Sequence, residues 1–165
     1  MMSHDAGLHY AFRQAHAAEN ELAKQLLDLA AQHRTDHEVH HVARDLARWS
    51  RENVGKLAET AADHALQLDA EADEPGRLRH LPEILATVVG RRPEPGLVLL
   101  EQLRGIYLLA SAASLAWEML AQHAQAKQET DILTLTSECH PRTLRQVRWA
   151  NTMIKTLSPQ VLTSL

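Results

Sequence analysis

Residues 8–29 read LHYAFRQAHAAENELAKQLLDL, and this stretch decides the fold. Its stripe of side chains recurs at intervals of four and three residues, which is the pattern of a helix that packs along one face. Glu19 occupies the middle of that stripe, where a leucine would be expected. A buried carboxyl group is costly without partners, so Glu19 predicts a metal, a cation or a hydrogen-bond network inside a helical bundle. The stripe consists of Leu8, Phe12, Ala15, Glu19, Leu22, Leu26 and Leu29.

The composition extends this helical pattern to the whole chain. The 165 residues are 45% apolar, yet they include only six glycines, one Phe, three Trp and two Tyr. Abundant Ala, Leu, Gln, Glu and Arg favour long helices, and no segment alternates with period two for long enough to predict a strand. At this length we expect a single all-α domain spanning residues 1–165.

Charge and cysteine content limit the partners and the compartment. A net charge of −4 argues against a nucleic-acid binder, which needs a basic face. The apolar run 105–117 is shorter than the roughly 20 residues of a membrane span, so we expect no membrane insertion. The single Cys139 and an N-terminus unlike a signal peptide predict a cytoplasmic protein.

Four helices are predicted, at about residues 5–32, 37–67, 97–126 and 130–157. Pro141 lies inside the fourth, and we favour a kink over a break into two helices, because the apolar stripe keeps its phase across it. Residues 68–96 hold four prolines and form a long crossover, with a short helix predicted near 82–89. A short loop, a long crossover and a short loop are how ferritin-like four-helix bundles are connected.

Each predicted helix carries a polar residue near the middle of its stripe. These residues are Glu19, Asn53, Ser114 and His140, and we expect them to form a polar mid-layer at one height of the bundle. In one interpretation Glu19 and His140 form a buried ion pair, which Asn53 and Ser114 complete as a hydrogen-bond network. Such a pair would raise the pKa of His140.

The second interpretation is a metal site at the same height. Di-iron bundles use a Glu from each of two helices and a Glu-x-x-His from each of the other two, and this chain supplies fewer carboxylates. We therefore expect one weakly held iron or manganese ion at most, with Glu19 and His140 as ligands and His16 or Glu138 turned toward them. The structural interpretation is preferred, with no cofactor.

The predicted third helix is apolar on almost all sides. One bundle core cannot cover every such face, and an exposed apolar surface of that size usually meets another protein surface. A homodimer is the simplest closed assembly that would cover it.

Two segments resemble the YciE/YciF stress-associated group of ferritin-like proteins. Residues 16–22 (HAAENEL) are similar to its first-helix segment, where Ala-Glu precedes an apolar stripe. Residues 46–57 (LARWSRENVGKL) are similar to its second-helix segment, where a Glu-Thr pair precedes Gln or His and then Val-x-x-Leu. The last two helices match by topology alone.

This resemblance implies a ferritin-like bundle that is commonly a dimer with a di-metal centre. Glu19 keeps the family's carboxylate, whereas Trp49 stands where the family has Glu and Asn53 where it has Gln or His. Both departures remove metal ligands. We therefore expect a non-catalytic, stress-associated or partner-binding bundle with a residual polar layer. The alternative is an iron- or manganese-binding oxidase or ferroxidase.

Overall fold

The computed structural model describes residues 5–73 and 94–165. These residues form four helices and no strand: α1 (Ala6–Gln32), α2 (His37–Asp63), α4 (Pro95–Lys127) and α5 (Thr130–Leu162). This confirms the all-α prediction and agrees with a four-helix bundle. The short helix predicted near 82–89 lies outside the described residues, as does most of the proline-rich connection.

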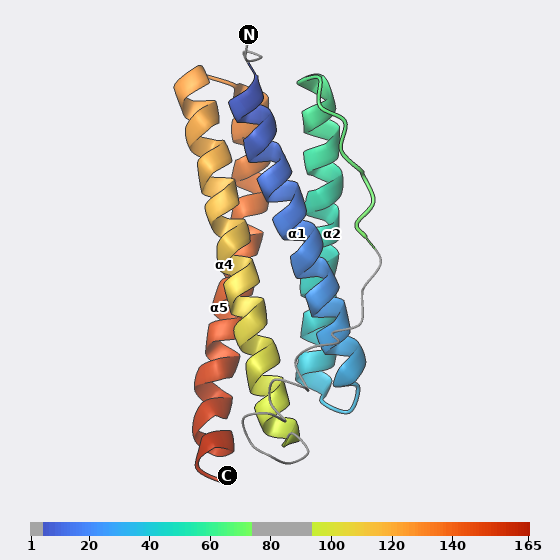
Figure 1. Cartoon of the computed structure of the whole chain (residues 1–165), viewed down its shortest axis with the longest axis vertical. Helices are drawn as coiled ribbons and strands as arrows, with labels where there is room; N and C mark the ends of the chain where they lie inside the picture. Colours follow the sequence, from blue (N-terminus) through green and yellow to red (C-terminus); the bar gives the residue numbers. More distant parts are fainter. Residues whose placement is uncertain (1–4, 74–93) are drawn as a thin grey trace.

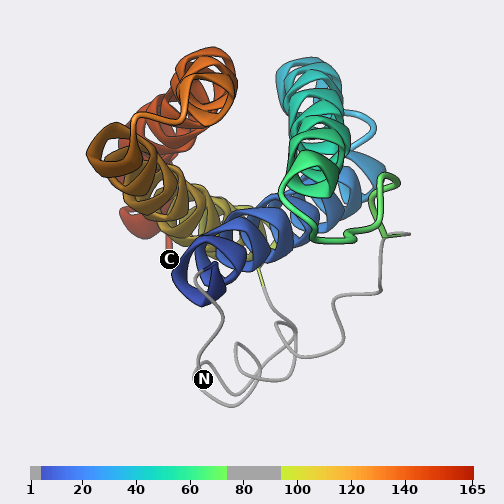
Figure 2. The same cartoon turned by 90° about the horizontal axis from the view of Figure 1, so that it is seen from above.

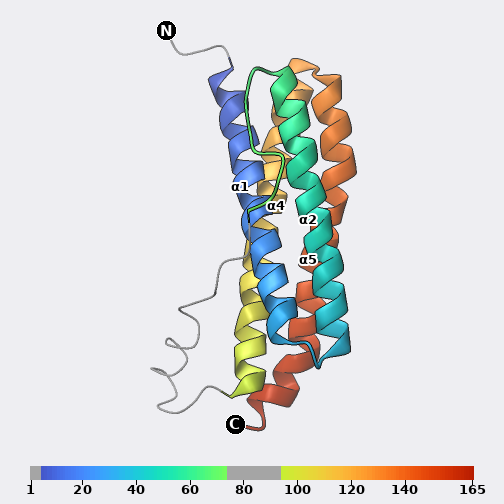
Figure 3. The ribbon, with the colours of Figure 1, turned by 90° about the vertical axis from the view of Figure 1, so that its right-hand side faces the viewer.

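The helices form two antiparallel hairpins that pack side by side (Figure 1). α1 pairs with α2, α4 pairs with α5, and α1 also lies against α4 while α2 lies against α5 (Figures 2 and 3). α2 and α4 are therefore diagonal, and they point the same way along the bundle. α2 and α4 are therefore not the two arms of one tight hairpin.

Residues 64–73 leave the end of α2 and return beside α1 (Figure 3). The imidazole Nε2 of His16 donates to the Asp69 carbonyl at 2.7 Å, and the side-chain oxygen of Asn20 accepts from the Asp73 N–H at 2.9 Å. These contacts fix the first part of the connection to α1. The predicted proline-rich crossover as a whole stays a prediction.

The buried apolar side chains form two separate clusters, one in each half of the bundle. One half is built around Leu22, Leu26 and Leu103, and the other around Phe12 and Leu120. Buried polar side chains occupy the level between them, in agreement with the sequence pattern. They include Glu19, Ser50, Asn53, Thr143 and Gln146.

α2 ends at Asp63, four residues before the predicted end at 67. Ala65 takes the left-handed conformation (φ 57°), and the Leu66 N–H donates to the Ala61 carbonyl at 3.0 Å. This is a Schellman cap, in which the buried Leu66 supplies the apolar contact. α4 ends in the same way at Gln128 (φ 59°). Neither position is a glycine, so the usual stop signal is absent from the sequence.

α5 continues to Leu162, past the predicted end at 157, and it runs through Pro141 and Pro159. The alternative of two separate helices is therefore wrong. The last turn of α5 packs on the first turn of α4, where a Cβ added to Gly96 would lie only 3.0 Å from Val161 Cγ2. We attribute the extra turn to this packing, which outweighs the tendency of a proline to end a helix.

The two caps make a testable prediction about stability. A non-glycine residue is disfavoured in the left-handed region, so Ala65→Gly and Gln128→Gly should each raise the free energy of unfolding by about 1 kcal/mol. The control is Ala62→Gly, at an exposed position inside α2, which should lower it by about 1 kcal/mol. Urea titration measures all three. Equal destabilisation by Ala65→Gly and Ala62→Gly would contradict the cap.

Candidate functional site

Glu19 lies at the middle of α1 and is completely buried. One of its oxygens, Oε1, accepts three hydrogen bonds, one from each of the other helices. The donors are Asn53 Nδ2 on α2 at 3.2 Å, Trp117 Nε1 on α4 at 2.7 Å and Thr143 Oγ1 on α5 at 2.8 Å. A single carboxyl oxygen therefore joins all four helices.

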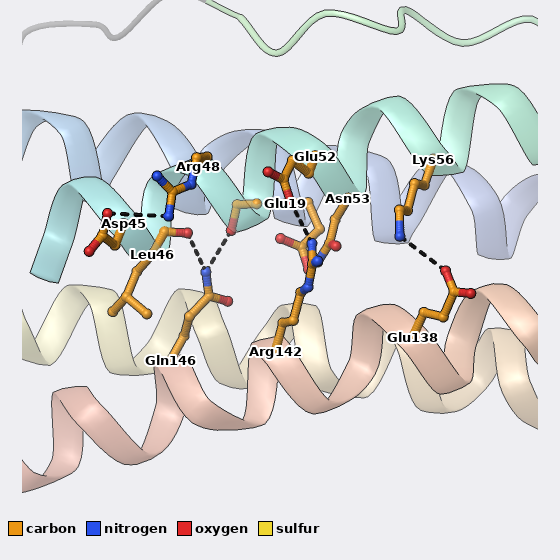
Figure 4. A network of polar contacts seen from close by, with 11 residues as sticks. Glu19, Asp45, Leu46, Arg48, Glu52, Asn53, Lys56, Glu138, Arg142 and Gln146 are labelled. Atoms are coloured by element: carbon orange, nitrogen blue, oxygen red, sulfur yellow. Dashed lines mark hydrogen bonds and ion pairs between the residues drawn. The ribbon is translucent and has the colours of Figure 1, made fainter.

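Gln146 makes a second buried connection between α5 and α2 (Figure 4). Its Nε2 donates to the Leu46 carbonyl and to Ser50 Oγ, each at 2.8 Å. Gln146 lies one helical turn after Thr143, on the same side of α5. We call the six residues Glu19, Ser50, Asn53, Trp117, Thr143 and Gln146 the Glu19 network.

Three oxygens of this network have no hydrogen-bond partner among the residues that the structure describes. They are Glu19 Oε2, Asn53 Oδ1 and Gln146 Oε1. All three are acceptors, so this level of the core has fewer donors than acceptors. A proton on Glu19 Oε2 would turn one of these acceptors into a donor.

The electrostatic environment favours that proton. Burial raises the pKa of Glu19 above its ordinary value of 4.5, and the polar hydrogens of Trp117, Thr143, Ser50 and Asn53 lower it only in part. The donors are all neutral, so no cation compensates for the loss of hydration of the carboxylate. The burial of Glu19 among neutral donors thus favours its protonated form up to a higher pH than for an exposed glutamate.

His140 does not pair with Glu19, and the expected ion pair is wrong. Its Nε2 lies 2.9 Å from Ser114 Oγ, and its Nδ1 lies 3.9 Å from Glu118 Oε2. The side chain sits at the edge of α5 toward α4, whereas Thr143, one turn later, points into the core. Burial lowers the pKa of His140, and Glu118 opposes that effect only in part. The expected rise in this pKa is likewise wrong.

The predicted polar mid-layer therefore divides into two separate pairs of contacts. Glu19 and Asn53 meet in the core, whereas Ser114 and His140 meet at the α4–α5 edge. The four residues do not form a single network.

The two additional ligands of the metal interpretation also lie apart from Glu19. His16 donates to the carbonyl of Asp69, and Glu138 accepts from Lys56 Nζ at 3.0 Å on the α2–α5 surface (Figure 4). Within residues 5–73 and 94–165 there is no group of three or more His, Cys, Asp or Glu side chains that could hold a metal ion. These donors do not fit the carboxylate-rich di-iron arrangement.

Cys139 is the remaining chemically reactive side chain near the network. Its thiol is buried, and burial raises its pKa to about 12. A thiol with that pKa stays protonated at neutral pH and is a poor nucleophile. Its environment is that of an unreactive thiol in the core.

The sequence pattern does not predict the hydrogen bonds of Trp117, Thr143 and Gln146. The heptad-like spacing of the third and fourth helices places Trp117 and Thr143 on apolar stripes, where core side chains are expected. One available signal was the indole N–H, because a buried tryptophan usually has a hydrogen-bond partner. Glu19 is the acceptor that satisfies it.

Comparisons with protein-family models, with curated proteins and with solved structures found no match to this chain.

The raised pKa of Glu19 predicts how stability depends on pH. The folded state holds the proton more tightly, so this contribution to stability is fully present below pH 4.5 and is lost as pH rises through the raised folded pKa. Glu19→Gln cannot ionise and still offers an acceptor oxygen. The free energy of unfolding of Glu19→Gln, relative to that of the native protein, should therefore rise with pH. Between pH 4.5 and the raised pKa of Glu19 the rise should be about 1.4 kcal/mol per pH unit. Urea titrations of both proteins from pH 4 to pH 9 measure this. A constant difference would contradict a neutral Glu19.

Thr143 allows a second test of the network. Thr143→Val keeps the shape of the side chain but removes a donor to Glu19, which should cost about 1–2 kcal/mol of unfolding free energy. The matched control is Thr134→Val, since the exposed Thr134 hydroxyl donates to the Thr130 carbonyl of its own helix. We expect the control to change stability by less than about 0.5 kcal/mol. Equal changes in unfolding free energy for Thr143→Val and Thr134→Val would show that the hydrogen bond to Glu19 does not contribute to stability.

Proposed function

We propose that this chain is a non-catalytic, ferritin-like helical bundle of the YciE/YciF type. It acts as a stress-associated or partner-binding homodimer in the cytoplasm, and its buried polar layer is the remnant of a di-metal site. The resemblance at residues 16–22 and 46–57 is the basis for the family and for stress association. The diagonal placement of α2 and α4, parallel to each other, supports a ferritin-like connection.

The observation that carries the proposal is the set of partners around Glu19. An amide, an indole and a hydroxyl donate to its carboxyl group, at the level where a metal-binding bundle would place further carboxylates and histidines. Neutral donors fix the positions of the four helices, but they do not bind a cation. This arrangement supports a structural function of the layer.

The competing function is an iron- or manganese-binding oxidase or ferroxidase. The observation in its favour is the three unpaired oxygens of Glu19, Asn53 and Gln146, because hard cations prefer oxygen donors. Only Glu19 among them can supply negative charge. Binding of a metal ion would also require deprotonation of Glu19, which the raised pKa of Glu19 opposes.

Metal analysis separates the two functions. The full chain is expressed with added iron or manganese, purified without chelator and measured by elemental analysis beside Glu19→Gln. We expect far less than one metal ion per chain and no difference between the two proteins. Near-stoichiometric metal that Glu19→Gln abolishes would overturn the proposal in favour of the metal-dependent class. Metal that both proteins retain would also overturn it, because a metal site independent of Glu19 would exist.

A further inference from the structure

The outward face of α4 carries an apolar stripe that the bundle leaves uncovered. Leu108, Leu115 and Met119 are 57%, 66% and 49% exposed. No charged residue occurs between Arg104 and Glu118 in the sequence. Exposed leucines of this kind on one helical face usually mark a contact with another protein.

The stripe is nearly palindromic. Arg104, Leu108, Ser111, Leu115 and Glu118 follow one another at intervals of four, three, four and three residues, so they share one face of α4. When the order is reversed about the point between Ser111 and Ala112, leucine falls opposite leucine. Arg104 then falls opposite Met119, one residue from Glu118, so the positive end of each helix lies beside the negative end of the other. A helix with this pattern complements a second, antiparallel copy of itself.

We propose that this face of α4 is the homodimer interface, with the two α4 helices antiparallel about a two-fold axis near Ser111. This inference rests on the homodimer of the proposed function and assigns its surface. Leu108 packs against Leu115 of the partner subunit, and Arg104 pairs with Glu118 of the partner subunit. The small side chains of Ser111 and Ala112 let the two helices approach closely at the axis.

The charges at both ends of the stripe make only local contacts within the described part of the bundle. Arg104 is 67% exposed and forms an ion pair with Glu101 on its own helix, at 3.5 Å. Glu118 is exposed, accepts a hydrogen bond from Gln122 on its own helix at 3.1 Å and lies 3.9 Å from His140 Nδ1, a long contact. Two symmetric Arg–Glu pairs would therefore lie on either side of the leucine contacts and form the polar rim of the interface, as in other protein interfaces.

The other exposed leucines in residues 5–73 and 94–165 do not form a comparable surface. Leu144 on α5 lies between Arg142 and Arg145 in the sequence, and Arg148 follows one helical turn after it. Leu162 and Leu165 are at the end of the chain. Leu144 therefore offers a matched control for Leu115.

A lipid surface is the other occupant that the apolar face could accept. α4 is long and apolar enough to cross a membrane by length and composition, with a mean hydropathy of 1.2 over its most apolar window. However, the same helix donates to Glu19 through Trp117 and buries Leu103 and Ile106 in the core. Insertion would break these contacts, whereas dimerisation keeps them, so the geometry favours a second copy.

The first experiment measures the mass of the full chain by light scattering. We expect the native protein at twice its chain mass of 18.5 kDa, Leu115→Glu at the single-chain mass and Leu144→Glu at twice that mass. Circular dichroism confirms that each variant keeps its helices, so that loss of the dimer is not loss of the fold.

A charge exchange tests the antiparallel register. Arg104→Glu and Glu118→Arg should each weaken dimerisation about tenfold, since each places like charges opposite each other at both ends of the interface. The double variant restores opposite charges and should regain most of the native affinity. A parallel arrangement or a different face would give no such restoration, which would overturn the register.

A disulfide tests the position of the axis. Ser111→Cys should form a covalent dimer on mild oxidation, because the two positions face each other near the axis. The native Cys139 is buried and should not cross-link, and Thr152→Cys, exposed on α5, serves as the control.

The outcomes separate failure of this inference from failure of the proposed function. A dimer that survives Leu115→Glu and does not cross-link through Ser111→Cys would overturn only the assigned surface. A single-chain mass for the native protein would overturn both this surface and the homodimer. Monomeric protein that binds vesicles of neutral and anionic phospholipid, and loses that binding in Leu115→Glu, would replace the second copy with a lipid surface.

Discussion

One carboxyl oxygen holds the four helices of this protein in register. Glu19 Oε1 receives a hydrogen bond from α2, α4 and α5, while Glu19 itself belongs to α1. A helix that slid by one turn would move by about 5.4 Å and would leave its donor unsatisfied in the core. The two apolar clusters on either side could tolerate several alternative packings, because leucine contacts are not directional. The polar contacts at Glu19 therefore select one arrangement, and they do so at the cost of burying a titratable group.

The chemistry of those donors decides what the layer can do. Trp117, Thr143 and Asn53 stabilise a carboxylate less than a cation would, and burial outweighs them, so the Glu19 pKa is raised. A carboxyl group that prefers its proton is well suited to hydrogen bonding and poorly suited to metal ligation. The neutral donors around Glu19 explain both properties. They leave the pKa of Glu19 raised, and they occupy the positions where a metal site would need further carboxylates. These neutral donors connect the pH dependence of stability with the structural function that we propose for the layer.

The sequence was sufficient to predict the helices and the burial of Glu19, because a seven-residue stripe with one polar member is a strong pattern. It also predicted that Asn53 would lie at the same height. It failed for His140, since the stripe of α5 contains polar residues at both His140 and Thr143, and only the rotation of the helix decides which one faces the core. Helix ends were missed where tertiary contacts overrule local preference. Ala65 accepts a left-handed conformation so that Leu66 can be buried, and α5 passes Pro159 because Val161 packs over Gly96.

The contacts of α4 explain why this helix is apolar on almost all sides. Within one turn, Ser114 contacts His140 at the edge toward α5, Leu115 faces outward, and Trp117 points inward to Glu19. A helix that only filled the core would carry charges on its outer face, as α2 does with Arg44, Arg48 and Arg51. On α4 the outer charges stop at Arg104 and resume at Glu118, which leaves uncharged the part of the helix that the proposed dimer would cover. The same rigid helix would then transmit the register fixed by Glu19 to the position of the second subunit.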